Sequence, residues 1–143
     1  MVPSNEIKRT IGIDYGEKRC GLARTDALGM MAHYLDPCTT DELFARLDAL
    51  QIESPYDKIV LGLPRRFDLR PTHSTESVEK LATSLRNKYP DVQLILWDER
   101  LTSKMAKQVL LDSGISKKRR QQKDEVNSVS ATLILQNYLD SLT

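Results

Sequence analysis

Apolar and β-branched residues gather in short runs near the start of the chain, as is typical of β-strands. Lys8 to Tyr15 is rich in β-branched residues, and Arg19 to Thr25 follows it after the short turn Gly16-Glu17-Lys18. Two such runs joined by a short turn predict an antiparallel hairpin. A third run around Met30 to Leu35 would extend this hairpin into a meander of three strands.

Beyond these strands, helical spacing of apolar residues alternates with further strand-like runs. Thr39-Thr40-Asp41 is a helix N-cap signal, and apolar residues at helical spacing follow it. Lys58 to Leu63 and Val92 to Trp97 are short, continuous apolar runs, which indicate strands buried on both faces. Three further helices are predicted, namely Ser74 to Lys88, Thr102 or Ser103 to Ser113, and Asp124 to Leu139.

This order of elements predicts an α/β fold. Three antiparallel strands in a meander, followed by two parallel strands that alternate with helices, would form a five-stranded mixed sheet flanked by helices. The length of 143 residues suits one domain, residues 1–143. The inward face of the last helix is expected to consist of Val126, Val129, Leu133, Tyr138 and Leu139.

The composition indicates a soluble protein of a reducing compartment. The apolar runs are far too short to span a bilayer, and the first ten residues contain no apolar signal segment. The two cysteines, Cys20 and Cys38, show no metal-ligand spacing and do not make a disulfide framework. We therefore expect a cytoplasmic protein that makes no membrane contact.

Basic residues are concentrated near the C-terminal end of the chain. Residues 101–123 contain seven lysines and arginines and one acid, whereas residues 1–57 contain six basic and ten acidic residues. Such a segment indicates a polyanionic partner, although a solvated charged loop has the same composition. Lysine or arginine contacts to phosphate add affinity without reading sequence. The candidate phosphate-binding residues are Lys104, Lys107, Lys117, Lys118, Arg119, Arg120 and Lys123.

Asp14 is the first candidate for chemistry. It ends an apolar run just before a glycine turn, a position poorly suited to the burial of a charge. A metal ion at the rim of the sheet would balance this charge, and Gly16 would let a phosphate approach closely. An Asx turn that closes the hairpin explains the same pattern without a ligand.

Other acids could join Asp14 in one site. Asp98 and Glu99 follow a strand at its carboxyl end, where open α/β sheets place ligand sites, and only one of them can face such a site because neighbouring strand residues point to opposite faces. Asp124, at the start of the last helix, could complete a cluster with Asp14 and Glu99 that holds two divalent ions on a phosphodiester. Oxygen ligands without histidine or cysteine favour Mg²⁺ or Mn²⁺ over zinc. The alternative is that Asp98 and Glu99 only favour the start of the following helix.

Together these stretches resemble the YqgF/RuvX family of RNase H-like proteins, described as Holliday junction resolvases and as nucleases of pre-16S rRNA. The matching stretches are IGIDYGEKRCGLA, VLGLP, DERLTS and VNSVSATLILQNYL, in this order over nearly the whole chain. The resemblance implies an RNase H-like fold and a metal-dependent nuclease that hydrolyses phosphodiester bonds in an rRNA precursor or in branched DNA. A resolvase that cuts two symmetric strands would favour a homodimer, whereas rRNA trimming needs only a monomer.

The resemblance also implies roles for individual residues. It makes Asp14 the first metal-binding carboxylate and Glu99 the second. After GLP the family commonly has an Asp-Gly pair, whereas this chain has Asp68-Leu69, so a loop that needs a positive φ would have to be rebuilt. The residues that the resemblance associates with the surroundings of the site are Lys18, Arg19, Arg100 and Thr102.

Asn127 stands where the family usually has a third catalytic aspartate. An amide supplies one neutral oxygen in place of a charged carboxylate, so weaker metal binding and slower catalysis would follow. Asp124 lies three residues earlier with an axial offset of about 4.5 Å, which is far for a direct ligand. Two functions therefore stay open, namely a metal-dependent nuclease and a catalytically impaired nucleic-acid-binding member of the same fold.

A third class of protein also opens with a hydrophobic strand and the pattern D-x-G. ATPases of the actin, Hsp70 and sugar-kinase type enclose a nucleotide between two such lobes. The 143 residues of this chain supply only one. The sequence therefore favours a nucleic-acid partner over a nucleotide-binding ATPase.

Overall fold

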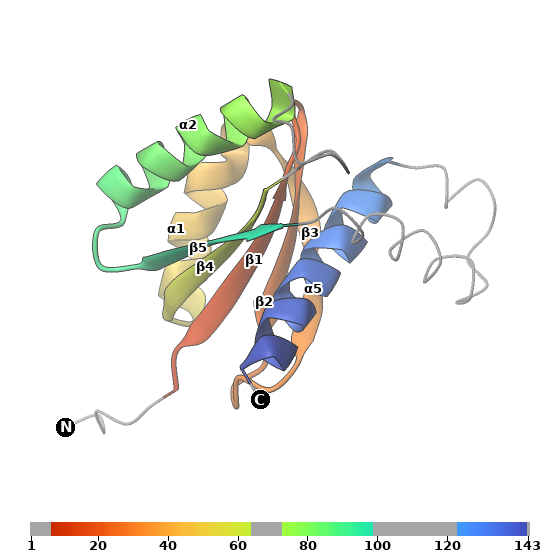
Figure 1. Ribbon diagram of the computed structural model, residues 1–143. Helices are drawn as coiled ribbons and strands as arrows, with labels where there is room; N and C mark the ends of the chain where they lie inside the picture. The colour runs from red at the N-terminus through yellow and green to blue at the C-terminus, as the bar shows by residue number, and fades with distance from the viewer. Residues whose placement is uncertain (1–6, 64–72, 99–122, 143) are drawn as a thin grey trace.

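The computed structural model describes residues 7–63, 73–98 and 123–142, apart from the side chains of residues 73–75 and 123–128. A five-stranded mixed sheet stands at its centre, with the strand order β3-β2-β1-β4-β5 (Figure 1). The strands are β1 (Arg9–Tyr15), β2 (Arg19–Thr25), β3 (Ala32–Thr39), β4 (Tyr56–Leu63) and β5 (Gln93–Asp98). The first three form an antiparallel meander, β4 pairs parallel to β1, and β5 pairs parallel to β4. This topology confirms the mixed α/β sheet that the sequence predicts.

Helices cover both faces of the sheet (Figure 1). The short 3-10 helix η1 (Thr40–Glu42) leads into α1 (Leu43–Glu53), which lies with α2 (His73–Lys88) on one face. The opposite face is covered by α5 (Lys123–Ser141). None of the helices in the described part of the chain is long and apolar enough to cross a membrane. The helix predicted to end at Ser113 lies outside the described residues.

Side chains of the strands alternate between two cores, one on each face. Between the sheet and the helices α1 and α2, Ile11 and Ile13 of β1 are buried beside Ile59 and Leu61 of β4. A smaller core lies beneath α5 and consists of Ala23, Val60, Ala131, Ile134 and Leu135. Strand β4 contributes to both cores, so the prediction of a strand buried on both faces is confirmed there.

The helix α5 comes unusually close to β1 at Gly12. A β-carbon at this position would lie 2.9 Å from the carbonyl oxygen of Ala131 and 2.9 Å from the β-carbon of Leu135. Only glycine lets the helix lie at this depth. Farther along α5, the side-chain oxygen of Gln136 accepts a hydrogen bond of 2.9 Å from the amide of Ala32, which ties the helix to the start of β3.

The face that α5 buries differs from the predicted one. Val129 and Leu133, which were predicted to point inward, are only half-buried, although Tyr138 and Leu139 do pack against the core. Apolar residues of this helix lie on more than one side of it, so their spacing does not define a single face. The contact with Gly12 selects the side instead. The apolar residues fully buried there are Ala131, Ile134 and Leu135, and the polar Ser130 is buried beside them.

Strand β5 corrects another prediction. It was expected to be buried on both faces, but it lies at the edge of the sheet and pairs with β4 alone among the described strands. Leu96 is accordingly 37% exposed. A run of apolar residues indicates a hydrophobic strand but does not indicate where the strand lies in the sheet. An edge strand and a central strand can therefore share the same pattern.

Strand β3 begins two residues later than predicted and extends to Thr39. Met30 and Met31 belong to the turn before it. The amide of Met30 donates to the carboxylate of Asp26 at 2.9 Å, and the amide of Asp26 donates to the carbonyl oxygen of Met31 at 3.0 Å. Gly29 supports this turn with a φ of 71°, a left-handed conformation that glycine adopts readily.

Candidate functional site

Asp14 lies near the end of β1 on the face of the sheet that α5 covers. Ile13 belongs to the core on the α1 and α2 side, and Gly12 faces α5. Because side chains alternate along a strand, Asp14 shares the face of Gly12. The residue is only 8% exposed, so Asp14 is buried even though its position at the strand end suggested exposure.

The strands on either side of β1 place glycines next to Asp14. In the antiparallel pairing with β2, Asp14 lies opposite Gly21. In the parallel pairing with β4, Ile13 lies beside Leu61, so Gly62 is the neighbour of Asp14 on the same face. With Gly12 two residues earlier, the carboxylate has three glycines as its nearest in-sheet neighbours on this face. No side chain of β2 or β4 therefore stands directly beside it.

The turn after β1 carries Lys18, which the sequence associates with the site, and Arg19 begins β2. Both side chains are exposed. The turn is held by Thr40, whose hydroxyl donates to the carbonyl oxygen of Gly16 at 2.7 Å and whose amide donates to the carbonyl oxygen of Lys18 at 2.9 Å. The structure thus brings Asp14 and the turn bearing Lys18 onto one continuous hairpin.

The contact of Thr40 with the turn is not evident from the sequence, in which Thr39-Thr40-Asp41 indicates only a helix cap. The capping contacts are made by Thr39, whose hydroxyl and amide donate to the carboxylate of Glu42 at 2.6 and 3.2 Å. These hydrogen bonds hold the pKa of Glu42 below its usual value. The side chain of Thr40 makes none of these capping contacts and instead contacts the hairpin turn. The only sign of this second role in the sequence is that the cap signal contains two threonines.

Two buried cysteines lie in the core next to the hairpin. Cys20 and Cys38 face each other across β2 and β3, and both thiols are free and buried. Burial raises the pKa of Cys20, hydrogen bonds with Gly16 and Thr40 oppose this rise, and the charge of Asp14 adds to it. Burial raises the pKa of Cys38 to about 11. Neither thiol has the depressed pKa of a reactive cysteine.

The last residue of β5, Asp98, lies on the opposite face of the sheet from Asp14. Trp97 packs edge-on against Tyr138 of α5, with ring centroids 5.9 Å apart, so it faces the α5 side. Alternation then turns Asp98 toward the α2 side. Asp98 is therefore set apart from Asp14, on the other face of the sheet.

The start of α5 lies toward the end of β1 that carries Asp14 (Figure 1). Gly12 contacts the helix at Ala131 and Leu135, and Asp14 lies two strand residues farther along β1. Within the helix, Asn127 is about 4.5 Å nearer to this contact than Asp124, because three helical residues rise by that distance. Asn127 is therefore the nearer of the two to the part of α5 that lies over β1.

Asp14 is the only predicted metal ligand whose side chain the structure describes. Within the described side chains, no group of three or more histidine, cysteine, aspartate or glutamate residues could hold a metal ion. The side chains of Lys123, Asp124 and Asn127 are among those not described. The predicted site residues that lie wholly outside the described part of the chain are Glu99, Arg100, Thr102, Lys104, Lys107, Lys117, Lys118, Arg119 and Arg120.

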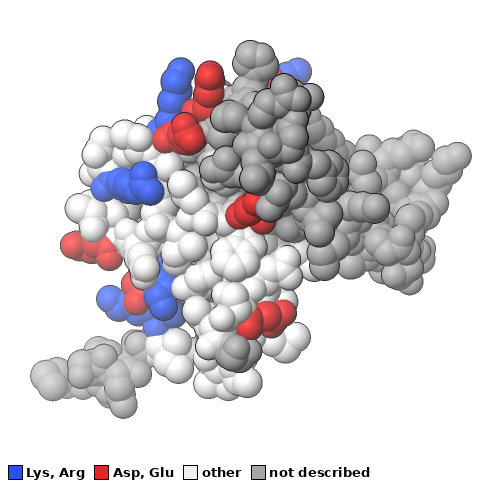
Figure 2. Space-filling model, in the orientation of Figure 1, with Lys and Arg blue, Asp and Glu red and all other residues white. Residues whose placement is uncertain are grey.

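One side of the molecule shows no concentration of positive charge among the described residues. On this side, basic and acidic side chains are interspersed and do not gather into a single positive patch (Figure 2). The basic residues between positions 101 and 122 lie outside the described part of the chain. Lys18 and Arg19 are thus the predicted phosphate-binding residues that the structure locates.

The strand order and pairing, with helices on both faces, define an RNase H-like fold. The chain is similar to the solved structure of Thermus thermophilus RuvC, with a TM-score of 0.53 at 14% identity over 94% of this chain and 97% of that one. A structure of Thermus thermophilus RuvC in complex with a Holliday junction substrate gives a TM-score of 0.51 at 15% identity over 90% of this chain and 92% of that one. Identities this low show the shared fold alone.

Sequence comparison identifies the family. The model of the RuvX family, described as Holliday junction resolvase, matches residues 8–141, and the chain belongs to this family. A protein of Flavobacterium psychrophilum named "Putative pre-16S rRNA nuclease" is 40% identical over 92% of this chain and 96% of its own length. A protein of Bacteroides thetaiotaomicron with the same name is 36% identical over 94% and 98%. These relatives confirm the resemblance seen in the sequence motifs.

Proposed function

We propose that this protein is a divalent-metal-dependent nuclease that hydrolyses phosphodiester bonds in structured nucleic acid. The observation that carries the proposal is the buried carboxylate of Asp14, surrounded by glycines on the α5 face of the sheet. Membership of the RuvX family and the nuclease names of its relatives support a nucleic-acid substrate.

The chemistry of Asp14 suits Mg²⁺ or Mn²⁺. Carboxylate oxygens are the ligands that these hard cations prefer. Because the neighbouring residues on β2 and β4 are glycines, no side chain from these positions would stand between the carboxylate and an ion bound on this face. The ion would polarise the phosphodiester and offset the negative charge that develops during hydrolysis.

The proposed ligands come from three parts of the chain. Asp14 would hold the ion from β1, Glu99 from the residue that follows β5, and Asp124 from the start of α5. We favour Glu99 over Asp98 because Asp98 lies on the face of the sheet away from Asp14. Asn127 would contribute a neutral oxygen from the first turns of α5 and would help to orient the groups around the ion.

Basic residues would bind the phosphate backbone of the substrate. Lys18 lies on the turn that begins two residues after Asp14, so a strand held at Asp14 would pass close to this turn. Arg19, Arg100 and the basic residues between 104 and 123 would extend the contact. Each phosphate neutralised in this way adds affinity that decreases as the salt concentration rises.

Two substrates fit this chemistry. One is a pre-16S rRNA, as the names of the relatives suggest. The other is a branched DNA of the Holliday junction type, as the family description suggests. Both present phosphodiesters in a structured nucleic acid, so the choice between them is made by a direct comparison of cleavage.

The test is cleavage of a four-way DNA junction and of a pre-16S rRNA fragment in Mg²⁺, in Mn²⁺ and in excess chelator. We expect metal-dependent cleavage of at least one substrate and its loss in Asp14→Asn. Asp36→Asn, which removes the same charge from an exposed position on β3, is the matched control and should cleave like the natural chain. No metal-dependent cleavage, together with no effect of Asp14→Asn, would reject the proposal.

A second candidate function rests on Asn127. The chain would then be a nucleic-acid-binding member of the family with impaired catalysis, because an amide replaces the expected third carboxylate. In this case the protein would bind the junction or the RNA fragment tightly while cleaving neither. Binding without cleavage is therefore the result that selects this function over the first.

A further inference from the structure

We infer that Thr40 is a positioning residue for the proposed nuclease site, which it serves by fixing the hairpin turn that carries Lys18. This inference rests on the proposed function and adds a residue that lies outside the matching family motifs. Thr40 is the first residue of η1, 24 positions away from Gly16 in the sequence, and it contacts the turn across the sheet.

One residue holds both ends of the turn. The Thr40 hydroxyl donates to the carbonyl oxygen of Gly16 at 2.7 Å, a short and therefore favourable distance. The Thr40 amide donates to the carbonyl oxygen of Lys18 at 2.9 Å. Gly16 and Lys18 are the first and last residues between β1 and β2, so both strand ends are fixed relative to Thr40.

Thr40 is itself held in place by its neighbours. Thr39 pairs with Arg19 in the β2 and β3 register, and its hydroxyl and amide donate to Glu42. On the interior side, the Cys20 sulfur lies 3.8 Å from the Thr40 hydroxyl oxygen. The hydroxyl thus sits between a buried thiol and the Gly16 carbonyl, and its position depends on packing as well as on one hydrogen bond.

The turn that Thr40 fixes lies close to Asp14 in the sequence. Gly16 is two residues after Asp14, and Lys18 is two residues after Gly16. Fixing the turn therefore fixes the path of the Lys18 backbone relative to the Asp14 carboxylate. A phosphate contact made by a side chain on an ordered turn requires less ordering on binding than one on a loose turn, so it contributes more to affinity.

The variants Thr40→Val and Thr40→Ser test this role. Valine keeps the shape and the backbone amide but removes the hydroxyl, and serine retains the hydroxyl. We expect Thr40→Val to raise KM by about five- to tenfold, in line with one lost hydrogen bond, with a smaller change in kcat. Thr40→Ser should restore the natural KM. Should the valine variant fail to fold, Thr40→Ala and Thr40→Ser make the same comparison.

A matched control is available on α2. The hydroxyl of Thr83 also donates to a backbone carbonyl, that of Glu79 at 3.2 Å, but on an exposed helix face. Thr83→Val should leave KM unchanged. A rise in KM for Thr83→Val equal to that for Thr40→Val would show a general effect of threonine removal and would overturn the assignment.

A second measurement connects Thr40 with Lys18. In chelator, the Kd for the four-way DNA junction or the RNA fragment is measured as a function of salt. Removal of one phosphate contact lowers the slope of log Kd against log salt by about 0.7 to 0.9. We expect Lys18→Ala to show this decrease, Thr40→Val to show part of it, and the double variant to show no more than Lys18→Ala alone.

The outcomes separate this inference from the proposed function. If Asp14→Asn abolishes cleavage while Thr40→Val changes neither KM nor the salt slope, the nuclease proposal stands and the role of Thr40 is rejected. If Thr40→Val only lowers the free energy of unfolding, with KM and slope unchanged, Thr40 is structural and the role is also rejected. If the natural chain binds and cleaves neither probe, both proposals fail together.

Discussion

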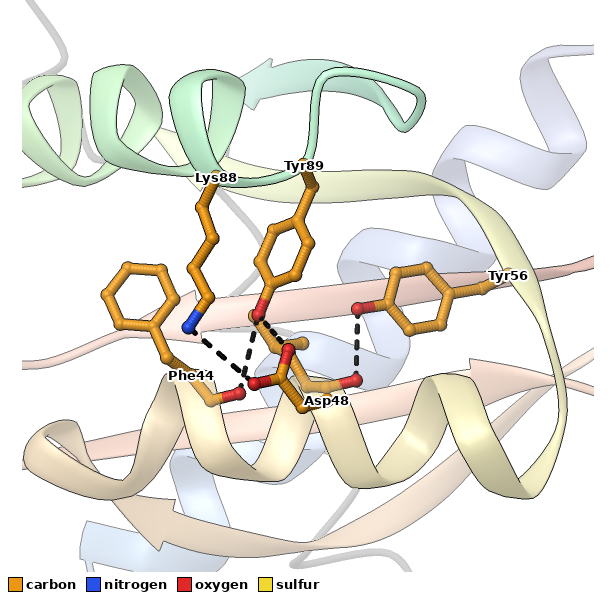
Figure 3. A network of polar contacts seen from close by, with 6 residues as sticks. Phe44, Asp48, Tyr56, Lys88 and Tyr89 are labelled. Carbon is orange, nitrogen blue, oxygen red and sulfur yellow. Dashed lines mark hydrogen bonds and ion pairs between the residues drawn. The ribbon is translucent and has the colours of Figure 1, made fainter.

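The hydroxyl of Tyr89 donates a hydrogen bond to Oδ1 of Asp48 at 2.7 Å and thereby joins the residue after α2 to the middle of α1 (Figure 3). The same hydroxyl lies 3.3 Å from the carbonyl oxygen of Phe44. Lys88 adds an ion pair of 3.6 Å with Asp48 and lies over the Phe44 ring at 4.9 Å. The two helices on this face of the sheet are thus connected by polar contacts as well as by the core.

Tyr89→Phe is expected to lower the free energy of unfolding by about 1 kcal/mol, because the Asp48 and Phe44 oxygens lose a hydrogen-bond donor. Urea unfolding followed by Trp97 fluorescence measures this change. Lys88→Met is the comparison, since its ion pair with Asp48 is about half exposed and should contribute less than about 0.5 kcal/mol. Equal losses in the two variants would contradict the importance of the Tyr89 hydrogen bond.

Alkaline pH is expected to destabilise the protein through its buried tyrosines. Burial raises the pKa of Tyr56 to about 12, and the charge of Asp48 adds to the shift. Burial and the hydrogen bond with Asp48 also raise the pKa of Tyr89. The folded chain then keeps protons that the unfolded chain has lost, so stability is retained below the usual pKa of 10.0 and falls as the pH rises toward 12.

Urea unfolding at pH 8 and pH 11 tests this expectation. Tyr56→Phe should reduce the decrease in stability between the two pH values without removing it, because Tyr89 still titrates. The Tyr56 hydroxyl donates to the carbonyl oxygen of Leu47 at 3.0 Å, so the variant will also be less stable at pH 8. An unchanged difference between the two pH values in Tyr56→Phe would show that another group is responsible.

Gly12→Ala is expected to destabilise the fold by about 1 to 3 kcal/mol, the usual cost of overpacking. The added methyl would lie 2.9 Å from a backbone oxygen of α5, which cannot move without the helix. Thermal or urea unfolding measures the loss. Ser130→Ala, on the same helix, is the contrast. Its hydroxyl is 1% exposed and has no hydrogen-bond partner among the described residues, so its removal should be neutral or stabilising.

Asn127→Asp is expected to raise the affinity for Mn²⁺ and the rate of cleavage, because a carboxylate in place of the amide adds a charged ligand to the proposed site. Calorimetric titration with Mn²⁺ and cleavage assays measure both. Asn137→Asp introduces the same charge ten residues farther along α5 and should change neither. A large gain in cleavage from a very low starting rate would indicate that the natural chain is impaired. No gain from a high starting rate would reject impairment.

Much of the architecture could be predicted from the sequence because local patterns determine it. The β-branched run of β1 and the continuous apolar run of β4 indicate strands, and the short turn at Gly16 indicates a hairpin. The edge position of β5 could not be predicted, since it depends on which strands pair. The buried face of α5 was missed for a related reason, because Gly12 and not the spacing of apolar residues selects it.

The same limit applies to the candidate site. The residue type and position of Asp14 were sufficient to single it out, but the face it occupies follows only from the register with Gly21 and from the alternation on β1. The opposite orientation of Asp98 likewise required the position of Trp97 against α5. Thr40 contacts Gly16 only because the meander brings β3 alongside β2, and no local pattern indicates such a contact.

The lack of a side chain in Gly12 has a consequence beyond packing. The depth at which α5 lies over β1 also determines how far the start of that helix stands from Asp14. A single methyl group at this position would therefore act as a spacer between two halves of the proposed site. Residue 12 would then tune reactivity without touching a substrate, and substitutions there would alter rate and stability together.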